Sequence, residues 1–467
     1  MKEIYILLFA LLTSSALGQL QQGQRVEILN ANSITVKRLY SGNVTILKGS
    51  VSLANAKGTF YCDSAKWWRN EDRFLAFGRI RYRSRDGVGI SAHQLEYVSG
   101  VAFLRGDVEL THNLQTLFTP NLKYDTDAGY GIFTMGGRIV TEDGSLTCNS
   151  GEYFSRDEHF IFNGKIEADT EDFILKCSRM EQWPKEHRYL IPKGGSAQKK
   201  IKSGTTFRLR GSINFGGCNL WKESDIRVSS FYNGVQSVDS TVQFEADSLF
   251  DNGNKTELFG KQTMAKWADW SGDSLEIHAF SILKSEQGQL LHAKGKVQTF
   301  QKNVVCVSHT LRWDTRDSIL RLGKRPIVWT NTYILSCDTL EWHQSHSLKM
   351  DSLYGFGMVN MVNQEDTMSS NELSGRHFYG YLNDDGPVYF RVSGNAQAIV
   401  QPDLENRFRA TCSDIELFFT GGNLDRVTMR QGPKGEVTSP VETMHLPGFT
   451  GESAQRPVRM EAISGLK

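Results

Sequence analysis

The chain has 467 residues, with 53 lysines and arginines against 52 aspartates and glutamates and a formal net charge of +1 at pH 7. This balance argues against a dedicated nucleic-acid-binding protein, because such proteins carry a strongly basic surface. Glycine is plentiful (43 residues), proline is scarce (10 residues) and aromatic residues make up 11% of the chain, which is typical of an all-β protein with many strands and turns.

The first 18 residues have the pattern of a cleaved secretory signal. An apolar run from about Ile4 to Ala16 is shorter than the roughly 20 residues that a membrane-spanning helix needs. Ala16-Leu17-Gly18 places small residues where signal peptidase cleaves. Residue 19 is Gln and not Cys, so lipoprotein processing is not indicated. We therefore expect a mature chain that starts at residue 19, is exported to the periplasm, and has an association with the outer membrane as an open alternative.

A Gly-x-Val or Gly-x-Ile motif recurs through the first part of the mature chain, at intervals of 29, 28, 31 and 27 residues. An aromatic residue follows each motif glycine after 16 to 19 residues, and a short step of small or polar residues precedes most of these aromatics. The glycines are Gly49, Gly78, Gly106, Gly137 and Gly164, and the aromatics are Trp67, Tyr97, Tyr124, Tyr153 and Trp183. Five consecutive matches predict a repeat architecture.

Each repeat is predicted to form two strands. After Gly78, Ile80 and Tyr82 alternate with arginines, which is the period of two expected for a half-buried strand. Helical periodicity never persists for three turns, since glycines or polar turn residues interrupt it. The predicted fold class is all-β, an elongated repeat-built β-jelly roll or β-solenoid with two or three consecutive blocks.

The expected domain order follows the regularity of the repeat. A cleaved signal peptide (1–18) precedes a β-repeat domain (19–190), and a basic Gly/Lys linker over 191–205 is expected to be flexible. A second, less regular β-repeat block covers 206–432, and a proline-containing tail covers 433–467.

Seven cysteines form an odd set, so at least one thiol cannot pair within the chain. Five of them fall at nearly the same place in the repeat, just before the small polar step, where other repeats have a serine or threonine nearby. These five are Cys62, Cys148, Cys177, Cys306 and Cys337, and the substitutes are Ser91 and Thr119. Free cysteine packs as a small apolar residue, so we expect structural thiols, with an occasional disulfide between neighbouring repeats or a metal or catalytic role as alternatives.

No catalytic, cofactor or metal site is predicted. The sequence lacks a His-Glu-x-x-His motif, a Gly-x-Ser-x-Gly elbow and a phosphate-binding P-loop. His343 and His346 flank a polar turn, where solvated side chains are a better explanation than a metal site. We therefore expect that the protein is not an enzyme, and a secreted hydrolase is a remote alternative.

Several segments resemble the OstA-like (organic solvent tolerance) family of lipopolysaccharide-transport proteins, which includes LptA-like proteins and the N-terminal part of LptD-like proteins. The similarity is carried by Gly42-Asn43-Val44, Gly49-Ser50-Val51, the stretch 59–65 (TFYCDSA) and the stretch 76–80 (AFGRI). It is strongest from about residue 38 to residue 183 and weaker beyond, where the stretches 378–382, 392–395 and 446–449 look like later parts of long OstA-like proteins.

The resemblance implies a β-jelly roll, open along one side, whose apolar interior holds lipopolysaccharide acyl chains. Such a trough suits the physics, because each CH₂ group exposed to water costs ~0.8 kcal/mol. The implied partners are the acyl chains of lipopolysaccharide (lipid A) and other Lpt-type jelly-roll proteins that dock by edge-strand addition, with no nucleic acid. The implied function is a non-enzymatic periplasmic bridge in outer-membrane assembly. The alternative is a structural, adhesive or glycan-binding β-repeat protein at the cell surface.

Alternation along the predicted strands selects the side chains that face the interior. The lipid-trough candidates are Val44, Ile46, Val51, Leu53, Phe60, Ile80, Tyr82, Phe103, Val108, Leu110, Ile132, Ile139, Phe162 and Ile166. The same residues could instead fill a closed, dry core with no room for lipid, and the sequence leaves both alternatives open.

Overall fold

The structure is a computed structural model. It describes residues 26–39, 42–54, 58–85, 87–112, 115–125, 128–203, 206–223, 226–238, 242–268, 274–285, 290–302, 304–314, 316–344, 350–363, 371–383, 386–400, 407–438, 446 and 456–458. The predicted signal sequence (1–18) and most of the predicted tail after residue 438 lie outside the described residues.

The all-β prediction is confirmed. The described residues form 33 strands and two three-residue 3₁₀ turns, η1 (Arg69–Glu71) and η2 (Pro184–Glu186). None of the helical segments in the described ranges has the length and apolar character needed to cross a membrane. The chain forms two compact units, Met1–Phe231 and Tyr232–Lys467, whose boundary falls within strand β18 (Ile226–Val238).

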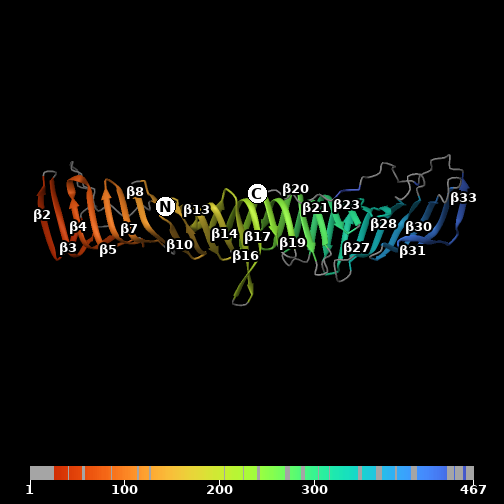
Figure 1. The fold of residues 1–467 in the computed structure, drawn as a ribbon, viewed down its shortest axis with the longest axis horizontal. Coiled ribbons are helices and arrows are strands. Elements are labelled where there is room, and N and C mark those ends of the chain that lie inside the picture. The colour runs from red at the N-terminus through yellow and green to blue at the C-terminus, as the bar shows by residue number, and fades with distance from the viewer. Residues whose placement is uncertain are drawn as a thin grey trace. The chain divides into compact units, whose positions relative to one another are not determined.

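The first unit is built from antiparallel strands that follow one another in chain order (Figure 1). Its strands are β1 (Glu27–Asn30), β2 (Ser33–Leu39), β3 (Gly42–Ala54), β4 (Gly58–Trp68), β5 (Arg73–Ser84), β6 (Gly89–Val98), β7 (Val101–His112), β8 (Gln115–Asp125), β9 (Tyr130–Phe133), β10 (Gly137–Thr141), β11 (Gly144–Cys148), β12 (Ser150–Phe154), β13 (His159–Thr170), β14 (Phe173–Trp183), β15 (Arg188–Ile191), β16 (Gly195–Ser203) and β17 (Thr206–Glu223).

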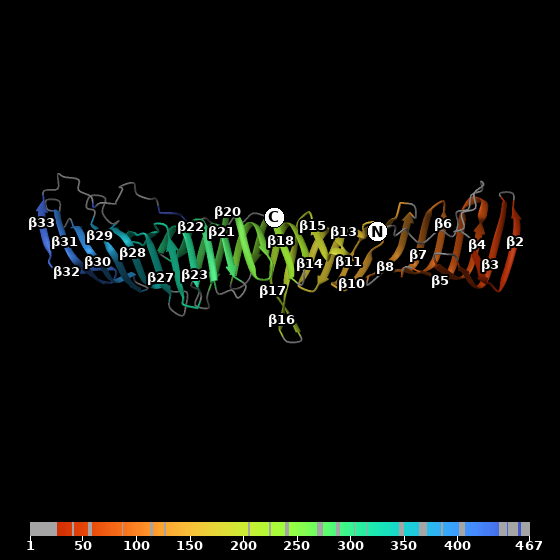
Figure 2. The ribbon, with the colours of Figure 1, turned by 180° about the vertical axis from the view of Figure 1, so that it is seen from behind.

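The second unit repeats this arrangement, and Figure 2 shows its strands side by side from behind. Its strands are β19 (Val242–Asp251), β20 (Lys255–Ala268), β21 (Ser274–Ser285), β22 (Leu290–Gln301), β23 (Val304–Asp314), β24 (Ile319–Gly323), β25 (Ile327–Trp329), β26 (Tyr333–Ser336), β27 (Thr339–Gln344), β28 (Met350–Asn363), β29 (Glu372–Asn383), β30 (Gly386–Val400), β31 (Arg407–Thr420), β32 (Asn423–Arg430) and β33 (Lys434–Thr438).

In four of the five repeats the Gly-x-Val or Gly-x-Ile motif forms a corner in the middle of a long strand, whereas Gly137 begins the short strand β10. At the corner of β5, Gly78 has φ +73° and Arg79 has φ +39°, a conformation that glycine adopts far more readily than other residues. The register against β4 shifts here, so that three residues of β5 oppose two of β4, which defines a β-bulge. The same pair of left-handed residues recurs at Gly49 with Ser50 and at Gly106 with Asp107.

At several corners a polar side chain of the preceding strand packs over the glycine, whereas the ring of Phe280 takes this place over Gly295 of the second unit. A Cβ atom added at Gly78 would fall on the Asp63 carboxylate and lie 2.9 Å from Asp63 Cβ. Arg79 then turns back to Asp63, with Nη2 donating to Oδ1 at 2.7 Å. His93 lies over Gly106 in the same way, and Asn149 lies over Gly164. The small polar step in the sequence is therefore the part of one strand that covers the corner of the next strand.

The bulge also explains why inward and outward residues do not alternate simply. In β5, the inward residues Phe74, Ala76, Ile80 and Tyr82 keep one parity across the corner. In β4, the inward set changes parity after Cys62, because the two residues Asp63 and Ser64 are not part of the core.

Residues 191–205, expected to be a flexible linker, instead contain strand β16. Its first part pairs with β14, where Cys177 opposes Gly195, and along its length it forms a hairpin with β17. Figure 1 shows the outer part of this hairpin projecting from the row of strands. Ala197 is fully buried, so a segment that looked like a connector by its lysines and glycines contributes an inward residue to the first unit.

The packing over the corner predicts that Gly78→Ala destabilises the protein more than Gly87→Ala. Both glycines have positive φ, +73° and +87°, so both variants bear the backbone cost of about 1–2 kcal/mol. Only Gly78→Ala also meets Asp63, while nothing lies within 4 Å of a Cβ at Gly87. We expect an additional loss of about 1–3 kcal/mol for Gly78→Ala, measured by urea unfolding. Equal losses for the two variants would show that Asp63 places no constraint on the corner.

Candidate lipid-binding interior

One wall of the interior in the first unit is a ladder of apolar residues, each opposite the next across neighbouring strands. All members are buried, because they lie on the same side of the corners and their side chains point into the interior. The ladder consists of Leu53, Phe60, Tyr82, Ile90, Leu110, Leu117, Ile139, Leu146, Ala168, Leu175 and Ala197. It is continuous from β3 to β16.

The opposite wall is made by the halves of the strands on the other side of the corners. Here large aromatic residues predominate, with alanine or glycine at intervals, and every member is buried. This second ladder consists of Trp67, Phe74, Tyr97, Ala102, Tyr124, Gly131, Tyr153, Phe160, Gln182 and Tyr189. The small residues leave room for the rings of their aromatic neighbours.

The two walls contact each other directly. The rings of Phe60, from the first ladder, and Phe74, from the second, pack edge to face with their centroids 5.6 Å apart. Farther along, Ile139 of the first ladder and Tyr189 of the second line a common cavity of only about 10 Å³. At these places the interior is filled by the protein's own side chains, so acyl chains could enter only if the walls separated.

Eleven of the fourteen residues predicted to face the interior are buried. Their exposure ranges from 0% for Phe162 to 8% for Leu110. They are Val44, Val51, Leu53, Phe60, Ile80, Tyr82, Val108, Leu110, Ile139, Phe162 and Ile166. Their burial shows a continuous apolar core.

The other three predicted residues, Ile46, Phe103 and Ile132, are only partly buried, and the structure corrects their placement. Ile46 opposes Lys66 and Phe103 opposes Lys123, whose Nζ lies 5.7 Å from the centre of the Phe103 ring. The inward positions belong to their neighbours Leu47, Leu104 and Phe133, which are 0–1% exposed. The prediction placed these three residues inside because their side chains are large and apolar. The corner, however, decides which residues of each strand face the interior.

The aromatic position of the repeat is a core position in four of the five repeats. Trp67, Tyr97, Tyr124 and Tyr153 are buried. Trp183 lies on the other face, stacked on His159 with ring centroids 4.3 Å apart and covered by the Arg188 guanidinium at 4.6 Å. Gln182 takes the inward position in its place.

In the second unit, tryptophans again contribute to the core. Trp313, Leu320, Trp342 and Leu353 oppose one another across four strands and are all buried. Trp329 packs in a cluster with Phe300 and Val305. These tryptophans are therefore core residues and not surface platforms for sugars.

All seven cysteines lie in the described residues as free thiols, six of them buried. Burial raises the pKa of the Cys62 thiol to about 12, with a further contribution from the neighbouring Asp63 carboxylate. Burial likewise raises the pKa values of Cys148 and Cys177 to about 12. Since a thiolate is the reactive form, these cysteines are poor nucleophiles at neutral pH.

The small residue beside the bulge has a specific role in hydrogen bonding. Cys337 Sγ donates to the carbonyl oxygen of Thr339 at 3.1 Å, and Thr119 Oγ1 donates to that of Asn121 at 3.0 Å. In the repeat that contains Cys306, Ser308 makes this bond, to the carbonyl oxygen of Thr310 at 3.1 Å. Cysteine, serine and threonine therefore occur here because each can donate to the carbonyl two residues ahead. The sequence comparison assigned Cys306 to this position of the repeat, but the structure places Ser308, two residues later, there.

Histidine, cysteine and carboxylate side chains are spread over the residues that the structure describes. Within those ranges, no group of three or more histidine, cysteine, aspartate or glutamate side chains is placed to hold a metal ion. His343 instead lies near Glu341, with Nε2 3.4 Å from Oε2. His346, the second residue of the sequence pair, lies outside the described residues.

The fold and interior define a class of protein: a repeat-built stack of antiparallel strands with a two-walled apolar core. Residues 23–178 match the family model of the OstA-like protein, which confirms the resemblance for that part of the chain. The match supports a relation to lipid and lipopolysaccharide transport in general, in a family that is non-enzymatic and typically periplasmic. A search of curated proteins finds no match to the chain.

The burial and raised pKa values of the cysteines predict slow thiol chemistry in the folded protein. At pH 8, Ellman's reagent should leave the six buried cysteines unreacted and reach at most Cys177, which is partly exposed. All seven should react once guanidinium unfolds the chain. Rapid reaction of several thiols in the native protein would contradict the packed interior.

Proposed function

We propose that this protein is a non-enzymatic, periplasmic lipid-binding bridge in lipopolysaccharide transport, which holds acyl chains between the two walls of its interior. The observation that carries the proposal is the first-wall ladder, apolar from β3 to β16, whose members up to Leu175 lie in the part of the chain that matches the OstA-like family. A continuous apolar surface lets a chain move from one strand to the next without entering water.

Loading requires the walls to move apart, because their side chains are in contact. The contact between Phe60 and Phe74 and the very small cavity beside Tyr189 mean that lipid must replace side-chain contacts. Acyl chains are as apolar as the side chains they displace, so this exchange costs far less than exposing either to water. The corners are the hinges of this opening, since the strands bend there and the bulge interrupts regular pairing.

The edges of the two units supply docking surfaces for partners of the same fold. At one edge, β2 pairs only with β3 among the described strands, and its Ile34 and Val36 side chains are 54% and 62% exposed. In the second unit, β33 pairs only with β31 in the described part, and Val437 is 62% exposed. Unpaired edges with apolar side chains favour strand addition by a jelly-roll partner.

Photocrosslinking from inward and outward positions tests whether lipid occupies the interior. A photoreactive amino acid at Ile80 or Leu110 should trap lipopolysaccharide in cells, because both side chains are buried in the first unit. The same group at Phe103 or Arg81, on the outer face, is the matched control and should trap little. Mass spectrometry of the purified protein should identify the bound lipid.

Two results would contradict this function. Crosslinks confined to Phe103 and Arg81 would place lipid outside the interior. Digestion of the protein by protease added to intact cells would place it at the cell surface instead of the periplasm.

A further inference from the structure

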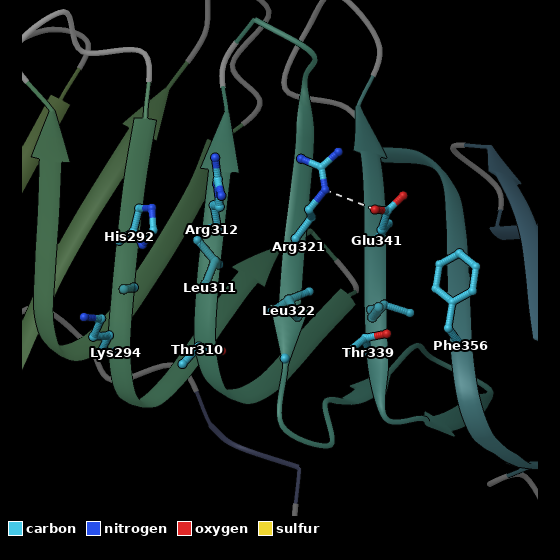
Figure 3. Close-up of a pocket in the computed structure, with 13 residues that line it drawn as sticks. His292, Lys294, Thr310, Leu311, Arg312, Arg321, Leu322, Thr339, Glu341 and Phe356 are labelled. Carbon is cyan, nitrogen blue, oxygen red and sulfur yellow. Dashed lines mark hydrogen bonds and ion pairs between the residues drawn. The ribbon is translucent and has the colours of Figure 1, made fainter.

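The outer face of the second unit carries a hollow of about 440 Å³ that spans β22, β23, β24, β27 and β28. Figure 3 shows its lining side chains on the five neighbouring strands. Its volume is in the range of small-molecule sites. It is separate from the apolar interior, because the residues between its side chains, such as Leu311 and Leu322, are buried and point the other way.

The hollow exists because three neighbouring strands of the sheet, β23, β24 and β27, have short side chains at positions that oppose one another. Lys294, Thr310, Gly323, Thr339 and Phe356 oppose one another in a row across the five strands. The three central residues leave a gap between the long side chains at the ends of the row. Four strand spacings separate the ends, roughly 19 Å, which is enough for more than one sugar ring.

One end of the hollow is cationic. His292, Arg312, Arg321 and Glu341 form the adjacent row, two residues along each strand from the first. Arg321 is neutralised by Glu341 at 3.0 Å and by Asp317 at 3.1 Å. Within the described part of the chain, Lys294 and Arg312 have no such carboxylate partner, although both are exposed.

The clustering of cations has an electrostatic cost that an anion would remove. Arg312 lies directly opposite Arg321 on the neighbouring strand, and like charges directly opposite each other destabilise a sheet. Burial and the charges of Arg312 and Lys294 lower the pKa of His292, which agrees with a positive potential at this end. The nearby Asp314 forms an ion pair with Arg316, whose Nη2 donates to its Oδ2 at 2.7 Å.

The other end of the hollow is aromatic. Phe356 is 39% exposed on the outer face and packs edge to face against His377 at 6.1 Å. Thr310 and Thr339 place hydroxyl groups between this ring and the cations. An exposed ring, two hydroxyls and two cations without a carboxylate partner among the described residues are the groups that bind a sugar face, sugar hydroxyls and a phosphate.

We propose that this hollow binds a phosphorylated saccharide, with its phosphate on Arg312 and Lys294 and a sugar ring against Phe356. Guanidinium and ammonium groups bind phosphate through charge-assisted hydrogen bonds. The saccharide is either a free sugar phosphate or the headgroup of a phosphorylated glycolipid. The site needs no acyl chain, so the proposal can be tested independently of lipid binding in the interior.

Isothermal titration calorimetry with trehalose 6-phosphate, trehalose and inorganic phosphate tests the chemistry of the site. Trehalose 6-phosphate should bind best. Arg312→Gln and Lys294→Gln should each weaken binding of trehalose 6-phosphate and of inorganic phosphate at least about tenfold. Phe356→Leu should weaken only the binding of trehalose 6-phosphate, which a nonspecific charge effect would not do.

A matched control and a filling variant complete the test. Lys261→Gln removes an exposed lysine elsewhere on the second unit and should leave binding unchanged. Gly323→Thr should abolish binding by filling the hollow, since a Cβ there already lies 2.9 Å from Thr310 Oγ1. Circular dichroism verifies that each variant is folded.

The source of the saccharide is distinguished with vesicles. Flotation with phosphatidylcholine vesicles that contain lipid A, lost in Arg312→Gln, would assign the site to a glycolipid headgroup. Binding of trehalose 6-phosphate without flotation would assign it to a free sugar phosphate. Equal binding of trehalose and trehalose 6-phosphate, equal binding by wild type and Arg312→Gln, or no binding of any probe would overturn the proposal. Crosslinking from Ile80 reports on the interior separately.

Discussion

The left-handed corner is the constraint on which the architecture depends. A long strand in a flat sheet would present one apolar face to one layer only. Two consecutive residues with positive φ, as at Gly78 and Arg79, bend the strand so that its two halves supply opposite walls of the same interior. Asp63 from the preceding strand fills the space left by the missing glycine side chain. The fold is thus built from recurring bends of this kind, and a side chain of the neighbouring strand packs over the glycine of the bend.

Much of this fold could be predicted from the sequence, because the bend has a chemical signature. Only glycine enters the conformation at low cost, so Gly49, Gly78 and Gly106 mark the corners at almost constant spacing. The pattern does not specify which individual side chains point into the interior. Because of the bulge, the alternation of inward and outward residues continues through one strand but shifts by one residue in its neighbour. Phe103 was therefore expected inside, whereas the structure has Ala102 and Leu104 there.

The direct contact between the two walls was not predicted, for a similar reason. Whether Phe60 meets Phe74 depends on the angle of the bend, and no local pattern encodes that angle. The basic segment around Lys200 was expected to be a linker because of its composition, but pairing with β14 and β17 decides its structure. The outer hollow of the second unit depends on three short residues, Thr310, Gly323 and Thr339, being in register across three strands, and the register is set by strand pairing and not by a local pattern.

The order of strand pairing has a consequence for how the chain reaches its native state. All-β proteins usually fold slowly, because their strands pair over long sequence separations. Here β3 pairs with β4, β4 with β5 and β5 with β6, so each of these strands pairs with its neighbour along the chain. Each hairpin can add to the one before it as soon as it is synthesised, without waiting for the C-terminal half. A repeat stack of this kind can fold in the order of its synthesis, with one growing edge at a time exposed to aggregation.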